Sequence, residues 1–181
     1  MARLEEESSA RSLGSSKASM KAKAHTIRRI EVLLAEYEQN HNNPTNKAIH
    51  CFAVPVTMLA TFAILWYLPT PSLFDLGPYV NWATILCAVG IIYYLTLSIP
   101  LALGMAIFSA IAGAVIQFSE AHASIPLIYI AVPVFIFAWV FLFVGHMIED
   151  RSLSFLVDLK FLAIEPVWPV YALFRCLGIP Y

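Results

Sequence analysis

Charged residues are scarce in this chain. Its 181 residues include 11 lysines and arginines and 12 aspartates and glutamates, together 13% of the sequence, whereas soluble domains carry roughly 25%. Hydrophobic residues account for 60% of the chain and the mean hydropathy is +0.73, so too little polar surface is left to dissolve a compact fold. The composition therefore predicts an integral membrane protein rather than a soluble domain.

The chain also has few cysteines, almost no net charge and no apolar segment at its N-terminus. Each of these features excludes a class of site or partner. The three cysteines are an odd set and Cys87 falls within an apolar stretch, so neither a disulfide framework nor a thiolate metal site is expected. The formal net charge of −1 offers no basic field for a nucleic acid. Residues 1–25 are polar and lack an apolar core, which predicts a disordered or loosely helical tail rather than a signal peptide.

Four long apolar stretches follow this tail. A transmembrane helix needs about 17 to 25 mostly apolar residues. We place the four predicted spans near Phe52–Leu68, Trp82–Ile99, Leu101–Phe118 and Ile125–Met147. The sequence therefore predicts an all-α membrane bundle, with residues 26–177 in a single domain. Only Ser98, Ile99 and Pro100 separate the second and third spans, which leaves open a tight hairpin or a kinked, partly re-entrant pair.

Basic residues lie on one side of the predicted bundle. Eight lysines and arginines precede the first span and three follow the fourth, whereas residues 69–81 and 119–124 contain none. Loops on the cytoplasmic side of a membrane carry the excess of lysine and arginine. We therefore expect both termini to be cytoplasmic, with an even number of crossings between them.

Amphipathic segments flank the predicted spans. Between residues 22 and 38 apolar side chains recur at steps of three and four, which is typical of a helix lying on or against the membrane. The Asn-Asn-Pro sequence at 42–44 interrupts this helix, and a new one is expected to begin near Thr45. The apolar segment Leu153–Leu177 is broken by charged residues and prolines, so we expect interfacial helices packed under the polar face of the bundle.

Histidines gather where the spans begin and end. His41 and His50 are nine residues apart, which on one straight helix would give them nearly opposite directions, but the turn between them allows the chain to fold back. Asn46 precedes His50 by one helical turn, so its amide can fix the tautomer of that imidazole. His146 and Glu149 share a helical face at the end of the fourth span. An even number of crossings allows both groups to meet on the cytoplasmic side.

Three imidazoles and a carboxylate suit a divalent transition metal. Fe(II), Zn(II) and Mn(II) all accept such ligands, and two histidines with one carboxylate and open positions are typical of oxygen-activating non-haem iron. A lone histidine at a helix end is usually a hydrogen-bonded residue rather than a ligand. Here, however, three lie at one predicted depth beside Glu149 and Asp150, where unpartnered ionisable groups are costly. The pattern predicts a metal site or a proton-handling site.

Two motifs of this sequence resemble those of a known family. The first runs from Tyr37 through His41, Asn46 and His50 to Pro55, and the second runs from Gly145 and His146 to Asp158 and Pro166. Both resemble the motifs of the 2-hydroxy fatty acid dioxygenase family of fatty acid α-oxidation. They occur in the expected order, separated by a hydrophobic block of the expected size, and the resemblance covers residues 25–175.

The resemblance implies a specific reaction and a specific metal. Members of this family are multi-span proteins of the endoplasmic reticulum or a bacterial inner membrane that use Fe(II) and O2 to shorten a 2-hydroxy fatty acid by one carbon, with release of CO2. On this basis we expect His41, His50 and His146 to hold Fe(II), with Glu149 as a fourth ligand or as a partner of a ligand. Asn46 and Asp158 are expected to orient imidazoles, and Tyr37 to hydrogen-bond the substrate.

The second motif departs from the family pattern. The branch to which the activity is best attached has a glutamate four residues after the histidine, whereas here Glu149 follows His146 by three and Asp150 follows it by four. The family's proline after this motif is replaced by Leu153 or Ser154. The chain is similar to a shorter, bacterial-style branch, and the ligating carboxylate is left open between Glu149 and Asp150.

Two other classes of protein compete with a dioxygenase. A non-enzymatic membrane protein for transport or assembly would use histidines to carry protons or to stabilise helix ends. Transport needs a polar path, however, and the predicted spans contain almost no ionisable residue. Fatty acid hydroxylases and desaturases need many clustered histidines, and five are too few. The sequence thus favours a membrane enzyme acting on a 2-hydroxy fatty acid among membrane lipids, without a nucleic-acid partner.

Overall fold

The computed structural model of the protein describes residues 29–71, 77, 79–149 and 161–181. Within these residues the chain is helical and forms no β-strand, which confirms the predicted all-α class. The elements in chain order are α2 (Arg29–Asn40), α3 (Pro44–Tyr67), α4 (Trp82–Leu95), α5 (Ile99–His122), α6 (Ile128–Ile148), the 3-10 helix η2 (Glu165–Val167) and α8 (Trp168–Leu177).

Three of these helices are long and apolar enough to cross a membrane. They are α3, α5 and α6, with 24, 24 and 21 residues, and each contains most of one predicted span. The remaining predicted span, Trp82–Ile99, corresponds to α4, which has only 14 residues. At 1.5 Å per residue α4 is about 21 Å long, which is less than the roughly 30 Å thickness of the hydrocarbon layer.

The early end of α4 follows from the residues that start α5. Thr96 is the C-cap of α4, and the side chain of Ser98 accepts a hydrogen bond from the backbone N–H of Leu101 as the N-cap of α5. Pro100 then lies in the first turn of α5, where its missing N–H costs nothing. The two apolar segments therefore form a tight hairpin, with α4 packed along α5.

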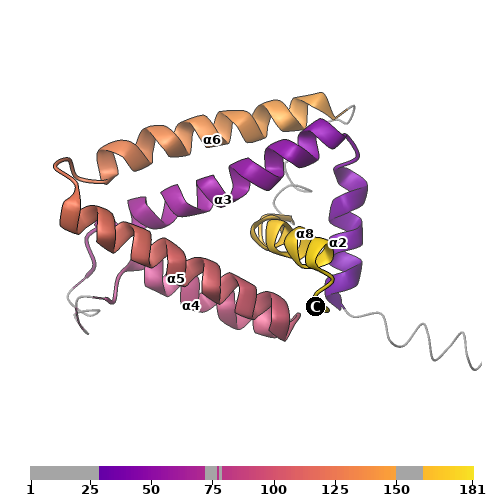
Figure 1. Cartoon of the computed structure of the whole chain (residues 1–181), viewed down its shortest axis with the longest axis horizontal. Coiled ribbons are helices and arrows are strands. Elements are labelled where there is room, and N and C mark those ends of the chain that lie inside the picture. Colours follow the sequence, from indigo (N-terminus) through magenta and orange to yellow (C-terminus); the bar gives the residue numbers. More distant parts are fainter. Residues whose placement is uncertain (1–28, 72–76, 78, 150–160) are drawn as a thin grey trace, which may run out of the picture.

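The helices form a wedge made of two antiparallel pairs (Figure 1). One pair is α3 with α6 and the other is α4 with α5. The pairs approach each other where α3 ends and α6 begins, and they spread apart toward the start of α3 and the end of α6. Both α2 and α8 lie at this wide end, so the two sequence motifs that carry histidines come together there.

An apolar core fills the wide end of the wedge. Ile30, Leu34 and Tyr37 of α2 are at most 1% exposed and belong to one cluster with Trp168 and Tyr171 of α8. The apolar face of α2 therefore packs against protein, so α2 is a structural part of the bundle rather than a helix that lies only on lipid. Residues 22–28 of the predicted amphipathic helix lie outside the described residues.

The outward faces of the spanning helices are apolar. On α6, for example, Phe137, Val140 and Phe141 are 68%, 52% and 58% exposed. So large an apolar surface would be unfavourable in water, whereas it suits the hydrocarbon layer of a membrane. This surface and the three long apolar helices identify a helical membrane protein.

Candidate metal centre

Three histidines converge at the wide end of the wedge. His41 lies between α2 and α3, His50 lies in the second turn of α3, and His146 lies near the end of α6. One ring nitrogen of each lies within 4.8 Å of the corresponding nitrogens of the other two. His41 and His50 are buried, with 6% and 1% of their surfaces exposed. The predicted meeting of the two histidine motifs is therefore present in the structure.

The turn between α2 and α3 brings His41 to this point. Helix α2 ends at Asn40, and α3 begins at Pro44, close to the predicted start at Thr45. The side chain of Asn43 accepts hydrogen bonds from the backbone N–H groups of Thr45 and Asn46, so it caps the new helix. Because α2 crosses the start of α3 at a steep angle (Figure 1), His41 faces the first turns of α3 instead of continuing a straight helix.

The contacts of His41 leave one nitrogen for a metal. Its Nδ1 lies 3.0 Å from the backbone oxygen of Tyr37; a carbonyl oxygen can only accept, so Nδ1 carries the proton and Nε2 carries the lone pair. The ring also stacks on the ring of Tyr37, with centroids 4.1 Å apart. Burial lowers the pKa of His41 below its usual 6.5, with smaller contributions from the neighbouring histidines. A neutral imidazole with a free lone pair is the form that binds a metal.

His50 is held at one nitrogen and unsatisfied at the other. Its Nδ1 lies 3.2 Å from the hydroxyl of Tyr37 and 3.2 Å from Oε1 of Glu165. With the proton on Nδ1, this nitrogen donates to the Glu165 carboxylate, and the lone pair is on Nε2. The Nε2 atom is buried and has no hydrogen-bond partner among the described residues. Buried polar atoms are almost always satisfied, so this orphaned nitrogen, on a ring whose centroid lies 4.7 Å and 4.9 Å from those of His41 and His146, fits a metal ion.

Tyr37 joins the two histidines from the side of α2. It accepts the hydrogen bond of His41 at its backbone oxygen and contacts His50 through its hydroxyl. Burial raises the pKa of the Tyr37 hydroxyl well above its usual value, and the negative charge of Glu165 raises it further. Tyr37 therefore remains protonated at any physiological pH. Tyr37 was expected to hydrogen-bond the substrate. Its hydroxyl contacts His50 and thus lies next to the candidate metal centre.

Glu165 was not among the site residues inferred from the sequence. In the sequence it only interrupts the apolar C-terminal segment, but in the structure it begins η2 and places its carboxylate on His50. Metal-bound histidines usually donate their second N–H to a carboxylate or carbonyl, and Glu165 has this position. One signal was present: an ionisable residue in a membrane protein's apolar segment is a functional candidate by default.

Glu149 joins the end of α6 to the start of α3. Its Oε1 accepts hydrogen bonds from the backbone N–H of Asn43 and from Nδ2 of Asn46, both at 2.9 Å. Burial alone would raise the pKa of Glu149, but these hydrogen bonds outweigh it and lower the pKa below 4.5. Asn46, expected to orient an imidazole, donates to this carboxylate instead, and His50 is oriented by Tyr37 and Glu165. The close group of potential ligands contains the three histidines without Glu149.

Gly145 allows α6 to approach α3 at this point. A Cβ atom at position 145 would overlap Oδ1 of Asn46 and would lie 3.4 Å from Cγ2 of Ile49. The glycine before His146 is therefore a packing requirement that brings this histidine within reach of His41 and His50. Asp150 and Asp158, the other predicted site residues, lie outside the described residues.

This arrangement can bind one divalent metal between the three ring nitrogens. Three neutral imidazoles suit iron, zinc or manganese, and open coordination positions would remain for other ligands. The neighbouring charge is negative, from Glu165, and the nearby hydroxyl of Tyr37 is neutral. The centre therefore combines metal ligands with groups that can orient a polar molecule.

Comparison with known proteins gives one family. The family model described as "2-hydroxy-palmitic acid dioxygenase Mpo1-like" matches residues 27–176. This range contains all three histidines and every other candidate site residue. No curated protein and no solved structure matches the chain.

Proposed function

Since the chain belongs to the Mpo1-like family of 2-hydroxy-palmitic acid dioxygenases, we propose that it is an Fe(II)-dependent dioxygenase of 2-hydroxy fatty acids. It would convert a 2-hydroxy fatty acid and O2 to the fatty acid shorter by one carbon, with release of CO2 and H2O. The observation that carries this proposal is the group of three histidines with ring nitrogens within 4.8 Å of one another, together with the buried Nε2 of His50, which lacks a partner among the described residues.

The protein's own residues have distinct parts in this proposal. His41, His50 and His146 hold Fe(II), and Glu149 is either a fourth ligand or, through Asn46 and Asn43, the link that keeps α6 beside α3. When bound, Fe(II) supplies the redox chemistry with O2 and open positions for the 2-hydroxyl and carboxylate oxygens of the substrate. Asp158 is a further candidate for orienting an imidazole.

Glu165 and Tyr37 tune His50. A carboxylate that accepts the Nδ1 proton fixes the tautomer of the imidazole and makes Nε2 a more basic ligand. Tyr37 stays protonated, so its hydroxyl, 3.2 Å from Nδ1 of His50, can donate a hydrogen bond to an oxygen atom of a bound substrate. Tyr37 belongs to the core at the wide end, whereas the side chain of Glu165 is 23% exposed.

The direct test uses the whole protein in lipid nanodiscs. Purified under argon and loaded with Fe(II), it is expected to convert 2-hydroxypalmitate and O2 to the fifteen-carbon acid, and bound iron is measured by mass spectrometry. His146→Ala is expected to lose both iron and turnover because one of three ligands is removed. His122→Ala, at an exposed histidine at the end of α5, should keep both.

The outcomes separate the proposal from its rivals. An active, iron-loaded His146→Ala variant would contradict the ligand assignment. If the wild type bound iron but formed no product, the metal centre would be supported and the substrate assignment would be wrong. If the wild type showed no bound metal and formed no product, the result would favour a non-enzymatic membrane protein with structural or proton-handling histidines.

A further inference from the structure

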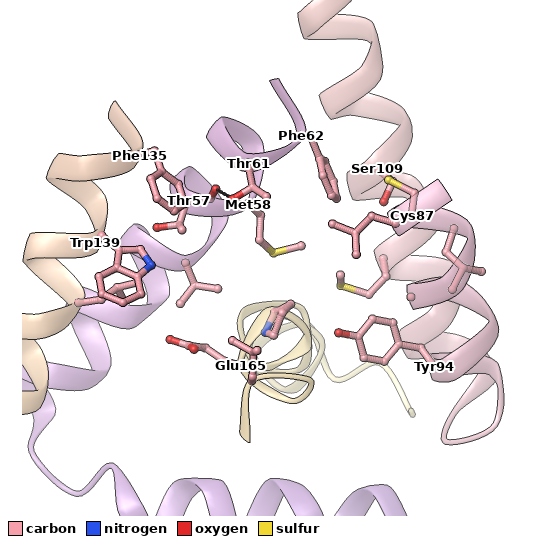
Figure 2. Close-up of a pocket in the computed structure, with 18 residues that line it drawn as sticks. Thr57, Met58, Thr61, Phe62, Cys87, Tyr94, Ser109, Phe135, Trp139 and Glu165 are labelled. Atoms are coloured by element: carbon pink, nitrogen blue, oxygen red, sulfur yellow. Dashed lines mark hydrogen bonds between the residues drawn. The ribbon is translucent and has the colours of Figure 1, made fainter. Parts of the chain in front are cut away.

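A cavity of about 410 Å³ opens between the two helix pairs (Figure 2). Its walls come from α3, α4, α5 and α6, and residues 162–166 close it from below. The lining is almost wholly apolar, and the labelled side chains of Met58, Phe62 and Phe135 point into it, whereas the carboxylate of Glu165 lies at one end. Glu165 is thus the one charged residue among the described residues that line the cavity, and it lies at one end.

The end of the cavity at Glu165 lies next to the candidate metal centre. Glu165 lines the cavity and also contacts Nδ1 of His50 at 3.2 Å. Val54 and Leu142, which also line the cavity, each lie one helical turn from a histidine, His50 on α3 and His146 on α6. One side chain, Glu165, therefore belongs both to the cavity wall and to the surroundings of His50.

The two threonine hydroxyl groups in the cavity wall have their protons in use. Thr57 donates to the backbone oxygen of Ala53 at 2.8 Å, and Thr61 donates to that of Thr57 at 2.7 Å. These two side chains therefore present their methyl groups and satisfied oxygens. A hydrocarbon chain would leave none of these protons unsatisfied.

The distance along α3 from His50 to the far end of the cavity matches the length of a long acyl chain. From His50 to Phe62 the helix advances about 18 Å at 1.5 Å per residue. An extended hydrocarbon chain with bonds of about 1.5 Å advances roughly 1.3 Å per carbon, so about 14 carbons fit that length. Phe62 forms the far end, because it is only 7% exposed and belongs to the core at the narrow end of the wedge, where its ring lies 6.4 Å from Phe108.

We infer that this cavity holds the acyl chain of the substrate, with its terminal methyl at Phe62, and that Phe62 and Gly90 set the longest chain accepted. This inference rests on the proposed function for the identity of the head group. Gly90 lines the cavity on α4, and a Cβ atom there would have only Cε2 of Tyr94 within 4 Å, at 3.9 Å. A larger side chain can therefore enter the cavity without displacing the backbone.

Two variants test the chain-length limit. Gly90→Leu is expected to lower kcat/KM for 2-hydroxypalmitate at least ten-fold. For 2-hydroxydecanoate its kcat/KM should stay within a factor of three of the wild-type value. Phe62→Leu is expected to extend the accepted range by two or more carbons. Gly113→Leu, the same change at a glycine of α5 with nothing near its Cβ and outside the cavity wall, is the control. A uniform loss for all chain lengths in Gly90→Leu, or an equal shift in Gly113→Leu, would overturn the inference.

Photolabelling tests the position of the chain without any turnover. We would bind 2-hydroxyhexadecanoate with a diazirine at its terminal carbon to the wild-type protein in nanodiscs and map the labelled residues by mass spectrometry. Labels on Phe62 or Cys87 support the inference. Labels confined to Phe52 and Phe137, in the outer groove between α3 and α6, overturn it. If Phe62 were labelled in a protein without turnover of 2-hydroxy fatty acids, the cavity would still be the acyl-chain site, and only the proposed reaction would be rejected.

Discussion

Two of the three histidines of the centre owe their tautomers to different neighbours. The backbone oxygen of Tyr37 keeps the proton of His41 on Nδ1, and a side-chain carboxylate, Glu165, can do the same for His50. In both rings this leaves Nε2 as the nitrogen with a lone pair. Two local hydrogen bonds, rather than the spacing of the histidines along the chain, therefore make these rings competent as ligands.

Protonation of His41 should be visible in the stability of the metal-free protein. Burial lowers the folded pKa of His41 below 6.5, so as the pH falls the unfolded chain takes up this proton first. The free energy of unfolding should therefore be highest above pH 6.5 and fall as the pH drops from 6.5 to the folded pKa. We would measure it by denaturant titration with a chelator present.

A variant isolates this contribution. His41→Gln cannot titrate and should show a shallower decline below pH 6.5 than the wild type. His122→Gln, at an exposed position, should follow the wild-type curve. A wild-type curve that is level or rises as the pH falls below 6.5 would contradict the expected sign.

Gly145→Ala should separate α6 from α3 at the metal centre. The added methyl group overlaps Oδ1 of Asn46, and overpacking of this kind costs about 1–3 kcal/mol. Since Asn46 holds Glu149, the variant should also retain less iron after dialysis against a chelator. Gly113→Ala, with open space around its Cβ inside α5, should raise the free energy of unfolding by up to about 1 kcal/mol and leave the iron content unchanged.

At the scale of elements, η2 and α8 connect the C-terminal segment to the metal centre. Glu165 begins η2 directly before α8, and α8 packs against α3 and α5. Gly104 allows the close approach of α8 to α5, because a Cβ there would lie 2.5 Å from Cγ1 of Val170 and 3.1 Å from Cζ of Phe174. The position of α8 therefore controls the position of Glu165.

Gly104→Ala should displace α8 and weaken the centre at a distance. We expect a loss of about 1–3 kcal/mol in unfolding free energy, together with a lower affinity for iron because Glu165 moves away from His50. Arg175→Ala removes the exposed ion pair of α8 with Glu38, and it should cost less than about 1 kcal/mol. Equal effects of the two variants would show that small-residue packing does not set the position of α8.

At the scale of the whole molecule, the wedge places chemistry at one end and hydrocarbon along the sides. The histidines, α2 and α8 share the wide end, whereas α3, α5 and α6 present apolar faces outward. The short α4 lies along α5 and lines the cavity between the pairs. A lipid-soluble substrate could thus reach a polar centre without leaving the membrane.

We predict that this wide end faces the cytoplasm, because lysines and arginines concentrate on its side of the chain. Cys176 near the end of α8 is exposed. With Cys51 and Cys87 replaced by alanine, it should react with a membrane-impermeant maleimide in inverted vesicles and not in intact cells. A cysteine introduced by Tyr79→Cys, at an exposed position between α3 and α4, should react in the opposite pattern.

Much of the fold could be predicted from the sequence because local patterns govern it. Long apolar runs determined the spanning helices, and the Asn-Asn-Pro sequence determined the break between α2 and α3. The histidine motifs could be matched because they are short and contiguous. The length of α4 was harder to predict, since hydropathy does not register the Ser98 cap that starts α5 early.

Only the tertiary structure decided how these parts meet. The pairing of Asn46 with Glu149, the contact of Glu165 with His50 and the cavity between the helix pairs all join segments far apart in the chain. Such contacts depend on how closely helices approach, which glycines such as Gly145 and Gly104 allow. The sequence by itself determined a helical membrane protein with histidines at the ends of its spans. Packing decided which nitrogens face one another, because side-chain distances follow from the crossing of helices and not from their order.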